Sequence, residues 1–381
     1  MPHARELELY FWVNILPMAH RTYQGIVLLA AIFLLIISCT PKGKTMRAYR
    51  LPDGQYRIEE DGKPVLQYNY QTVYEKDVIR FNDELREKPV EGEVSGSYRD
   101  EYISQHPGVP KDTVVTTNIY AVPRSDYIHP LFGLQGETLT RDWPIDGEPH
   151  HRGIWWAWPE VRYGSLQGDL YALQRIFARP TGKVDLVNSP DYAQIAAENR
   201  WMWEDKKPIV VENSVIRVYA ATTDKRIIDI TIRLTALEDS ISIATRQTNS
   251  YGCFNIRMQS PQSQSLTHFT DQPGTSTLRS WSDLSGTFRD AGSPSGLSIL
   301  QYKGNPDYPG PWVEYPNLAW VQPAFPAHGT RYPLVKGQPL VLRYRLVIHN
   351  GAKPDDAVTA VWWDEYHQPS APLFQFDPSR K

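Results

Sequence analysis

Residues 129–160 crowd groups capable of proton transfer and anion binding into one short stretch of the chain. Imidazole, guanidinium and carboxylate side chains recur there, between glycines and indole rings. A histidine can take or give a proton near neutral pH, and an arginine can hold a carboxylate or a developing oxyanion. Indole rings offer flat apolar faces with a polar edge. This mixture predicts a site for a hydroxylated ligand such as a sugar.

The strongest catalytic candidates are the adjacent His150 and His151, with Asp142 and Glu160 on either side. Successive residues of an extended strand point to opposite faces, so we expect one of the two histidines to enter a given pocket. That histidine would act as general acid or base, and Asp142 would orient it. The alternatives are a structural histidine, a local salt bridge at Asp142 and a solvated Glu160.

A wider set of polar and aromatic residues is predicted to bind the substrate. Arg257 alternates with Ile256 and Met258, so its side chain should face away from theirs; an ordinary outward arginine is the alternative. The turn-rich segment 305–312 is either a wall of the site or a plain surface loop. The predicted binding residues are His129, Arg141, Arg152, Trp155, Trp156, Arg257, Asn305 and Trp312.

Metal binding is the other chemistry that these histidines could support. His129, His150, His151 and an acid could supply nitrogen and oxygen ligands to a divalent metal. No H-x-x-x-H, H-x-H or C-x-x-C spacing is present, which argues against a tightly held ion. We therefore predict no cofactor and keep a divalent metal at the histidine cluster as the alternative. Cys253 is expected to be a small buried hydrophobic residue.

The elements that position these residues are predicted to be strands. The 31 prolines, 12 tryptophans and 22 tyrosines favour a β-rich fold with many turns. Asp61-Gly62 is a hairpin signal, residues 355–367 have helical spacing, and the glycine-rich stretch 129–160 predicts loops. Residues 170–177 fit either a strand or a short helix. The predicted strands lie within 56–74, at 114–122, 194–203, 209–220, 227–237, 241–248, 297–302 and 340–348.

This pattern predicts an all-β fold, one large antiparallel β-sandwich with few short helices. The formal net charge of −3 and the absence of a basic block argue against a nucleic-acid partner.

The first 39 residues carry a secretion signal. The apolar run 26–37 has the length of a signal-peptide core, and Ser38-Cys39 after it is similar to the lipobox of bacterial lipoproteins. We expect Cys39 to be lipidated, translation to start at Met18, and a lipid anchor to hold the chain at the cell envelope. An uncleaved anchor helix is the alternative. Residues 40–45 are then a tether, and 46–381 form one domain with an exposed insertion near 83–112.

Several segments resemble a bacterial family labelled "methane oxygenase PmoA". They are SDYIHPLFGLQGETLTRDWP from residue 125, HHRGIWWAW from residue 150, and later IRMQS, GNPDYPGPW and LRYRLVIHNG. One short apolar run cannot supply the spanning helices of a membrane oxygenase, so we reject the label's chemistry. The resemblance implies a sandwich similar to galactose mutarotase and a role in sugar degradation. Glu148-Pro149 depart from the family pattern where a further histidine is expected, which weakens any three-histidine metal site.

These observations predict an extracytoplasmic enzyme with a carbohydrate substrate. Proton abstraction next to a carbonyl suits the residues, giving a lyase, dehydratase or epimerase in polysaccharide degradation. A glycoside hydrolase using Glu160 and Asp142 is one alternative. A sugar-binding lipoprotein without catalysis is the other.

Overall fold

The computed structural model describes residues 45–74, 123–142, 150–269 and 279–368. The signal segment with Met18 and Cys39, the strand expected at 114–122 and the insertion near 83–112 lie outside the described residues. Thr45–Lys381 forms one compact unit. Its strands form antiparallel sheets, which confirms the predicted fold class.

Sheet 1 has eight strands, all antiparallel to their neighbours. Their order is β1 (Met46–Arg50), β2 (Tyr56–Glu60), β3 (Lys63–Asn69), β4 (Tyr127–Leu131), β5 (Ile154–Ala157), β13 (Cys253–Arg257), β18 (Trp320–Pro323) and β17 (Trp312–Tyr315). The hairpin at Asp61-Gly62 joins β2 to β3, as predicted.

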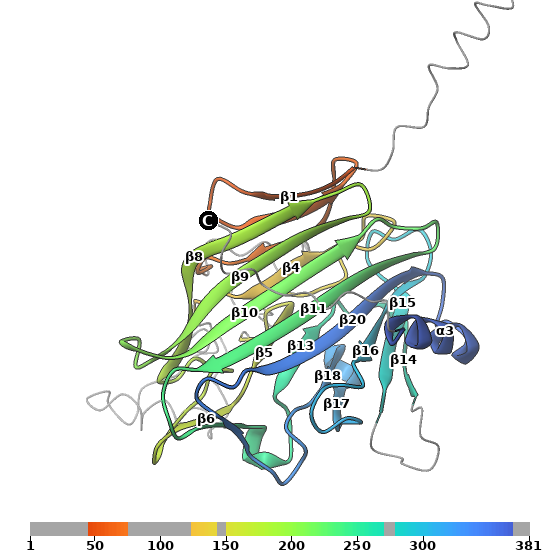
Figure 1. Ribbon diagram of the computed structural model, residues 1–381. Coiled ribbons are helices and arrows are strands. Elements are labelled where there is room, and N and C mark those ends of the chain that lie inside the picture. The colour runs from red at the N-terminus through yellow and green to blue at the C-terminus, as the bar shows by residue number, and fades with distance from the viewer. Residues whose placement is uncertain (1–44, 75–122, 143–149, 270–278, 369–381) are drawn as a thin grey trace, which may run out of the picture. The chain divides into compact units, whose positions relative to one another are not determined.

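Sheet 2 also has eight strands and holds the long elements of the chain (Figure 1). Their order is β14 (Gln262–Phe269), β15 (Trp281–Thr287), β16 (Ser295–Gln301), β20 (Leu340–Asn350), β11 (Lys225–Ala236), β10 (Lys207–Tyr219), β9 (Tyr192–Trp203) and β8 (Ile176–Asn188). A smaller third sheet has the order β19 (Tyr332–Leu334), β12 (Ile241–Ala244), β6 (Glu160–Tyr163) and β7 (Leu166–Gly168).

Sheets 1 and 2 pack face to face around one apolar core. On β11, Ile228, Ile230 and Ile232 are fully buried, as their period of two predicts. From the facing sheet, the Phe254 ring stacks on Tyr344 with ring centres 4.3 Å apart. This packing leaves each sheet a second face, turned away from the shared core.

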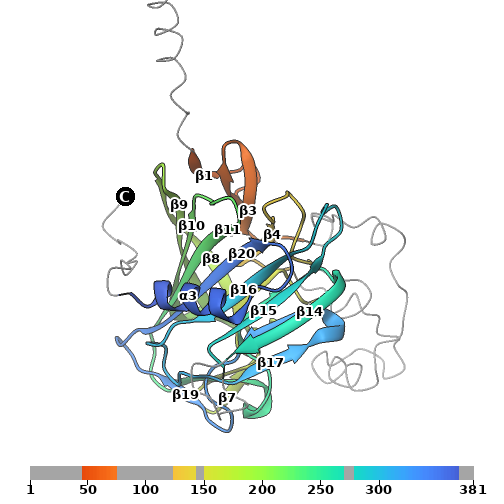
Figure 2. The same ribbon diagram turned by 90° about the vertical axis from the view of Figure 1, so that its right-hand side faces the viewer.

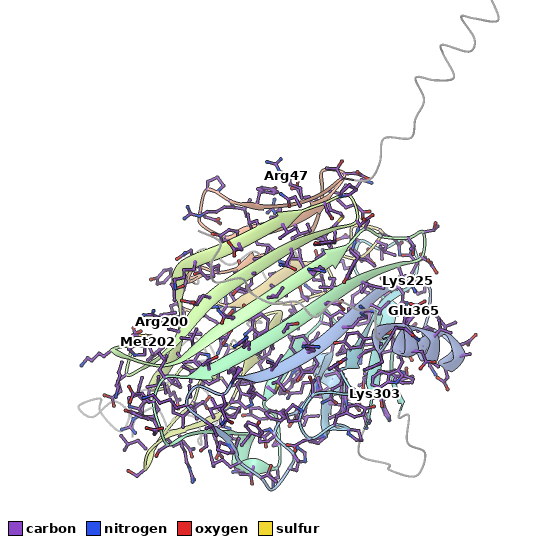
Figure 3. All side chains as sticks on the ribbon, in the orientation of Figure 1. Arg47, Arg200, Met202, Lys225, Lys303 and Glu365 are labelled. Carbon is purple, nitrogen blue, oxygen red and sulfur yellow. The ribbon has the colours of Figure 1, made fainter. Side chains whose placement is uncertain are left out.

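Helix α3 (Asp356–Tyr366) packs on the outer face of sheet 2 over β15, β16 and β20 (Figure 2). Trp362, Trp363 and Tyr366 form a second apolar cluster with residues of β15, β16 and β20. The Lys225 ammonium reaches the Glu365 carboxylate at 3.2 Å and ties β11 to the helix (Figure 3). The helix is confirmed, although two of the valines in its apolar pattern are exposed. Within the described ranges, no helix is long and apolar enough to cross a membrane.

Three local expectations were wrong. The stretch 129–160, expected as loops, contains part of β4 and all of β5, because pairing across the sheet overrides its glycines and prolines. The strand expected over 241–248 stops at Ala244; a 3-10 turn follows in which Gln247 is left-handed and its N–H donates to Glu160. Residues 170–175 form turns, and β8 begins only at Ile176.

Candidate functional site

The outer face of sheet 1 is polar and aromatic, and it is buried along the strands β3, β4, β5, β13 and β18. Along each strand, residues alternate between this face and the core. Tyr68, Ile128 and Ile256, for example, point into the core between the sheets. Their neighbours point outward: Gln67 and Asn69 on β3, Tyr127 and His129 on β4, Trp155 on β5, Asn255 and Arg257 on β13, and Trp320 and Gln322 on β18.

A cavity of about 240 Å³ lies over β3 and β4 on this face. Drug-sized ligands occupy roughly 300–1,000 Å³, so the space suits a single small ring. Its walls combine carboxylates, amides and hydroxyls with an apolar surface of similar extent, which matches a ligand with both hydroxyl groups and an apolar ring face. The lining residues are Asp53, Gln55, Gln67, Asn69, Thr72, Val73, Tyr127, His129 and Asp142.

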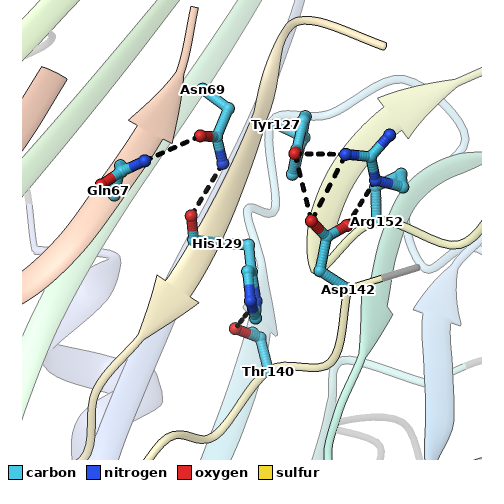
Figure 4. A network of polar contacts seen from close by, with 7 residues as sticks. All are labelled: Gln67, Asn69, Tyr127, His129, Thr140, Asp142 and Arg152. Carbon is cyan, nitrogen blue, oxygen red and sulfur yellow. Dashed lines mark hydrogen bonds and ion pairs between the residues drawn. The ribbon is translucent and has the colours of Figure 1, made fainter. Parts of the chain in front are cut away.

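Hydrogen bonds hold the polar walls of the cavity in place (Figure 4). The Gln67 amide donates to Asn69 Oδ1 at 3.0 Å, and the Asn69 amide donates to the His129 carbonyl at 2.7 Å. The His129 imidazole contacts the Thr140 hydroxyl at 2.9 Å, and that hydroxyl accepts the Leu131 N–H at 3.0 Å. The His129 ring is therefore fixed beside the cavity.

Asp142, Arg152 and Tyr127 form a buried ionic cluster at the edge of the cavity (Figure 4). Both carboxylate oxygens of Asp142 accept from Arg152, and Oδ2 also accepts the Tyr127 hydroxyl at 3.2 Å. Burial lowers the pKa of Arg152, but Asp142 and Tyr127 together outweigh burial and leave the pKa above its ordinary value. We expected Asp142 to orient a histidine; in the structure its oxygens are occupied by Arg152 and Tyr127.

The two adjacent histidines lie among aromatic rings, next to Trp155. His151 is the buried one, at 2 % exposure, and His150 is partly exposed. The His151 ring centre is 4.7 Å from that of Trp320 and 5.4 Å from that of Trp155. Its Nδ1 has no hydrogen-bond partner within the described part of the chain. His151 is thus the more deeply buried of the two histidines, and neither is among the residues that line the cavity over β3 and β4.

Both imidazoles are neutral at neutral pH. Burial, with help from three nearby arginines, lowers the pKa of His150 to about 3. Burial also lowers the pKa of His151 well below its usual range, and His150, Arg257 and Arg124 add to the effect. A neutral imidazole can accept a proton, but these rings do so less readily than an exposed histidine.

A stacking platform exists, but two of the predicted tryptophans are not in it. Trp156 points into the core and donates to Glu212, and Trp312 lies on the face opposite Tyr315, donating to the Arg279 carbonyl. The outward aromatic pair is Tyr315 and Trp320, stacked with ring centres 4.7 Å apart. Period-two counting from Trp155 would have turned Trp156 inward. Trp320 was missed because its short strand gave no signal.

Three further candidates have local structural roles. On sheet 3, the Glu160 carboxylate pairs with Arg331 and accepts the Gln247 N–H at 2.7 Å. The Asn305 amide exchanges two hydrogen bonds with the backbone of Arg343, at 2.8 and 2.9 Å. Arg141 joins the site through its backbone, donating its N–H to the Arg257 carbonyl at 3.0 Å. Its side chain is half-buried.

Metal ligation and thiol chemistry find little support in the described ranges. They contain no group of three or more His, Cys, Asp and Glu side chains placed to hold a metal ion. Cys253 is buried, and burial raises the pKa of its thiol to about 12, so the reactive thiolate is disfavoured.

The fold and this site define an all-β sandwich protein with a buried polar face on one sheet. Residues 111–363 match a family of unknown function, DUF6807, and the chain belongs to that family. A search of curated proteins found no match.

Proposed function

We propose that the protein binds a carbohydrate on the outer face of sheet 1 and acts on it by proton transfer. The observation that carries the proposal is the alignment of nine buried polar or aromatic side chains on one face, beside the cavity of about 240 Å³. A fold alone does not define a reaction, so the proposal rests on these side chains. The similarity to galactose mutarotase inferred from sequence motifs belongs to this proposal, as does anchoring at the cell envelope through Cys39.

His151 is the proposed general base and His129 the group that orients the sugar. A neutral imidazole can take a proton from the carbon next to a carbonyl. The anion that develops would be stabilised by the neighbouring guanidinium of Arg257, which lies next to Trp320 on the same face. This chemistry gives a lyase, dehydratase or epimerase. Glu160 is held by Arg331 on another sheet, which disfavours a two-carboxylate hydrolase.

The test is turnover of a panel of sugars and oligosaccharides, both native and oxidised at a ring carbon. We expect His151→Ala to lower kcat/KM for the active sugar by about 10²- to 10⁴-fold, the usual contribution of a general base. His328→Ala is the control, because His328 is exposed and its ring contacts the Ser250 carbonyl at 3.3 Å, away from the proposed site. Turnover that survives His151→Ala would contradict the base assignment. Sugar binding without turnover would instead favour a non-catalytic binding protein.

A further inference from the structure

Buried polar atoms without hydrogen-bond partners gather on the outer face of β5, β13 and β18. Such atoms cost about 1–3 kcal/mol each and are rare in native proteins, so a cluster calls for a bound partner. The register that pairs Ile256 with Val321 also sets Asn255 opposite Gln322. Among the described residues, the unpartnered atoms here are His151 Nδ1, Trp155 Nε1, Trp320 Nε1, Asn255 Oδ1, and both amide atoms of Gln322.

These atoms supply both donors and acceptors. The two indole N–H groups donate only, Asn255 Oδ1 accepts only, and the Gln322 amide does both. Asn255 is held in place because its own amide nitrogen donates to the carbonyls of Trp155 and Cys253, at 3.3 and 2.8 Å. A ligand that satisfies this set must carry several hydroxyl or carboxyl oxygens close together.

The charges around this cluster are mainly positive. Arg124 is buried and donates to the carbonyls of Leu170 and Tyr171. Burial and the nearby Arg152 lower the pKa of Arg124 to about 10, although Asp126 and Asp169 act in the opposite direction. Arg257 is buried beside Trp320, and Arg246 pairs with Asp169 at 2.6 Å. The charged groups that depress the pKa of His150 are all arginines. An anion placed here would therefore be favoured over a neutral group.

We propose that the ligand of this face is an acidic sugar, whose carboxylate lies beside Arg257 and Arg124. Its ring would rest against Trp320, and its hydroxyls would satisfy Asn255, Gln322 and the indole N–H groups. The cavity and the cluster lie side by side on this face, because the cavity's wall residue Tyr127 is the direct cross-strand partner of Trp155. This inference rests on the proposed carbohydrate function and specifies its substrate class.

The experiment measures the binding of two matched pairs of sugars to the full-length chain by tryptophan fluorescence and calorimetry. Glucuronate is compared with glucose, and galacturonate with galactose, so that the two sugars of each pair differ in the carboxylate. We expect the acidic member to bind about 10- to 100-fold more tightly, as a charge-assisted contact predicts. Arg257→Gln should remove this preference, and Arg257→Lys, which keeps the charge, should retain most of it. Arg47→Gln, at an exposed position of β1, is the control (Figure 3).

Thermal unfolding of each variant separates lost binding from lost folding. Equal affinity for acidic and neutral sugars would overturn the acidic-sugar inference and leave the carbohydrate function standing. An acidic preference that Arg257→Gln leaves unchanged would also overturn it. Failure of every sugar, acidic or neutral, to bind would contradict both proposals. A preference lost in Arg257→Gln and kept in Arg257→Lys, with both variants folded, supports the inference.

Discussion

At the scale of single residues, two arginine–aspartate ion pairs have the same geometry but differ in burial. Arg152 binds Asp142 through two of its nitrogens while almost completely buried. Arg179 also binds Asp205 in a bidentate manner, with Nε to Oδ1 at 2.8 Å and Nη2 to Oδ2 at 3.0 Å. These two side chains are 31 and 49 % exposed. Removing one partner of a buried pair leaves an uncompensated charge, whereas an exposed group regains water.

The two aspartates therefore form a matched pair of variants. We expect Asp142→Ala to lower the free energy of unfolding by about 3–5 kcal/mol, because Arg152 would stay buried without its partner. Asp205→Ala should cost about 1 kcal/mol or less. Urea unfolding followed by fluorescence measures both. Equal losses in the two variants would show that burial does not control the strength of this pair.

The sequence identified many of the residues in the site but not their directions. His129, Asp142, His151, Arg152 and Arg257 are brought to one face, and alternation with Ile256 predicted the direction of Arg257. The partners of these residues depend on contacts between distant segments, such as β4 with β5 and β13 with β18. Trp320 is the clearest omission: its strand has only four residues, too few for a periodic signal.

At the scale of elements, the junction of β4 and β5 depends on Gly153. Its φ is +56°, and a Cβ there would lie 2.2 Å from the Ile128 carbonyl oxygen and 2.9 Å from the His129 Cβ. Only glycine lets the chain turn in this way while the two strands approach so closely. Gly153 therefore sets how closely β5 can pack against β4.

Gly153→Ala tests this junction, and Gly164→Ala is its control. Gly164 has a similar φ of +61°, but a Cβ there would meet nothing within 4 Å. Each variant should lose about 1–2 kcal/mol through left-handed strain. Gly153→Ala should lose a further 1–3 kcal/mol or so through the clash with β4. Thermal and urea unfolding give the comparison. Similar losses at the two positions would contradict the close approach.

Elements with a strong period of two were predictable, and irregular ones were not. β11 and β20 follow the predicted alternation because one face of each is packed against the core. β4 and β5 are short, rich in tryptophan or interrupted by proline, and are fixed by pairing with neighbours. The 3-10 turn after β12 depends on Glu160, a residue far away in the sequence.

At the scale of the whole molecule, two carboxyl groups lie in the core between the main sheets. Glu212 accepts the indole N–H groups of Trp156 and Trp201, at 2.5 and 2.7 Å, and Asp126 accepts the Tyr68 hydroxyl at 2.6 Å. Burial raises the pKa of Glu212 well above its usual range, and the adjacent Asp126 raises it further. Burial also raises the pKa of Asp126.

A raised pKa means that the folded protein holds this proton more tightly than the unfolded chain does. The contribution of protonated Glu212 to the free energy of unfolding should thus be fully present below its ordinary pKa of 4.5. It should decline as the pH rises towards the pKa of Glu212 in the folded protein. The decline is at most about 1.4 kcal/mol per pH unit. Glu212→Gln keeps the acceptor oxygen without titrating, so its free energy of unfolding should fall less steeply between pH 5 and 8.

Urea unfolding across that pH range provides the measurement. The buried histidines contribute the opposite slope below their ordinary pKa of 6.5, where their stabilising neutral form is lost as pH falls. That contribution is common to both proteins and cancels in the comparison. Identical slopes for the natural chain and Glu212→Gln would show that Glu212 is already ionised in the folded state.

The position of β20 constrains the order in which the molecule can fold. It lies in the interior of sheet 2 between β16 and β11, although it is the last described strand in the chain. Strands β8 to β11 pair with their neighbours in the sequence, so these pairs can form early. The other edge of β11 pairs with β20, where Thr231 lies opposite Arg343, and this pair can form only after β20 has been made. Contacts between such distant residues slow folding. During synthesis, the edge of β11 that pairs with β20 therefore stays unpaired until nearly the whole domain has left the ribosome. In that interval the chain is most exposed to strand-to-strand aggregation.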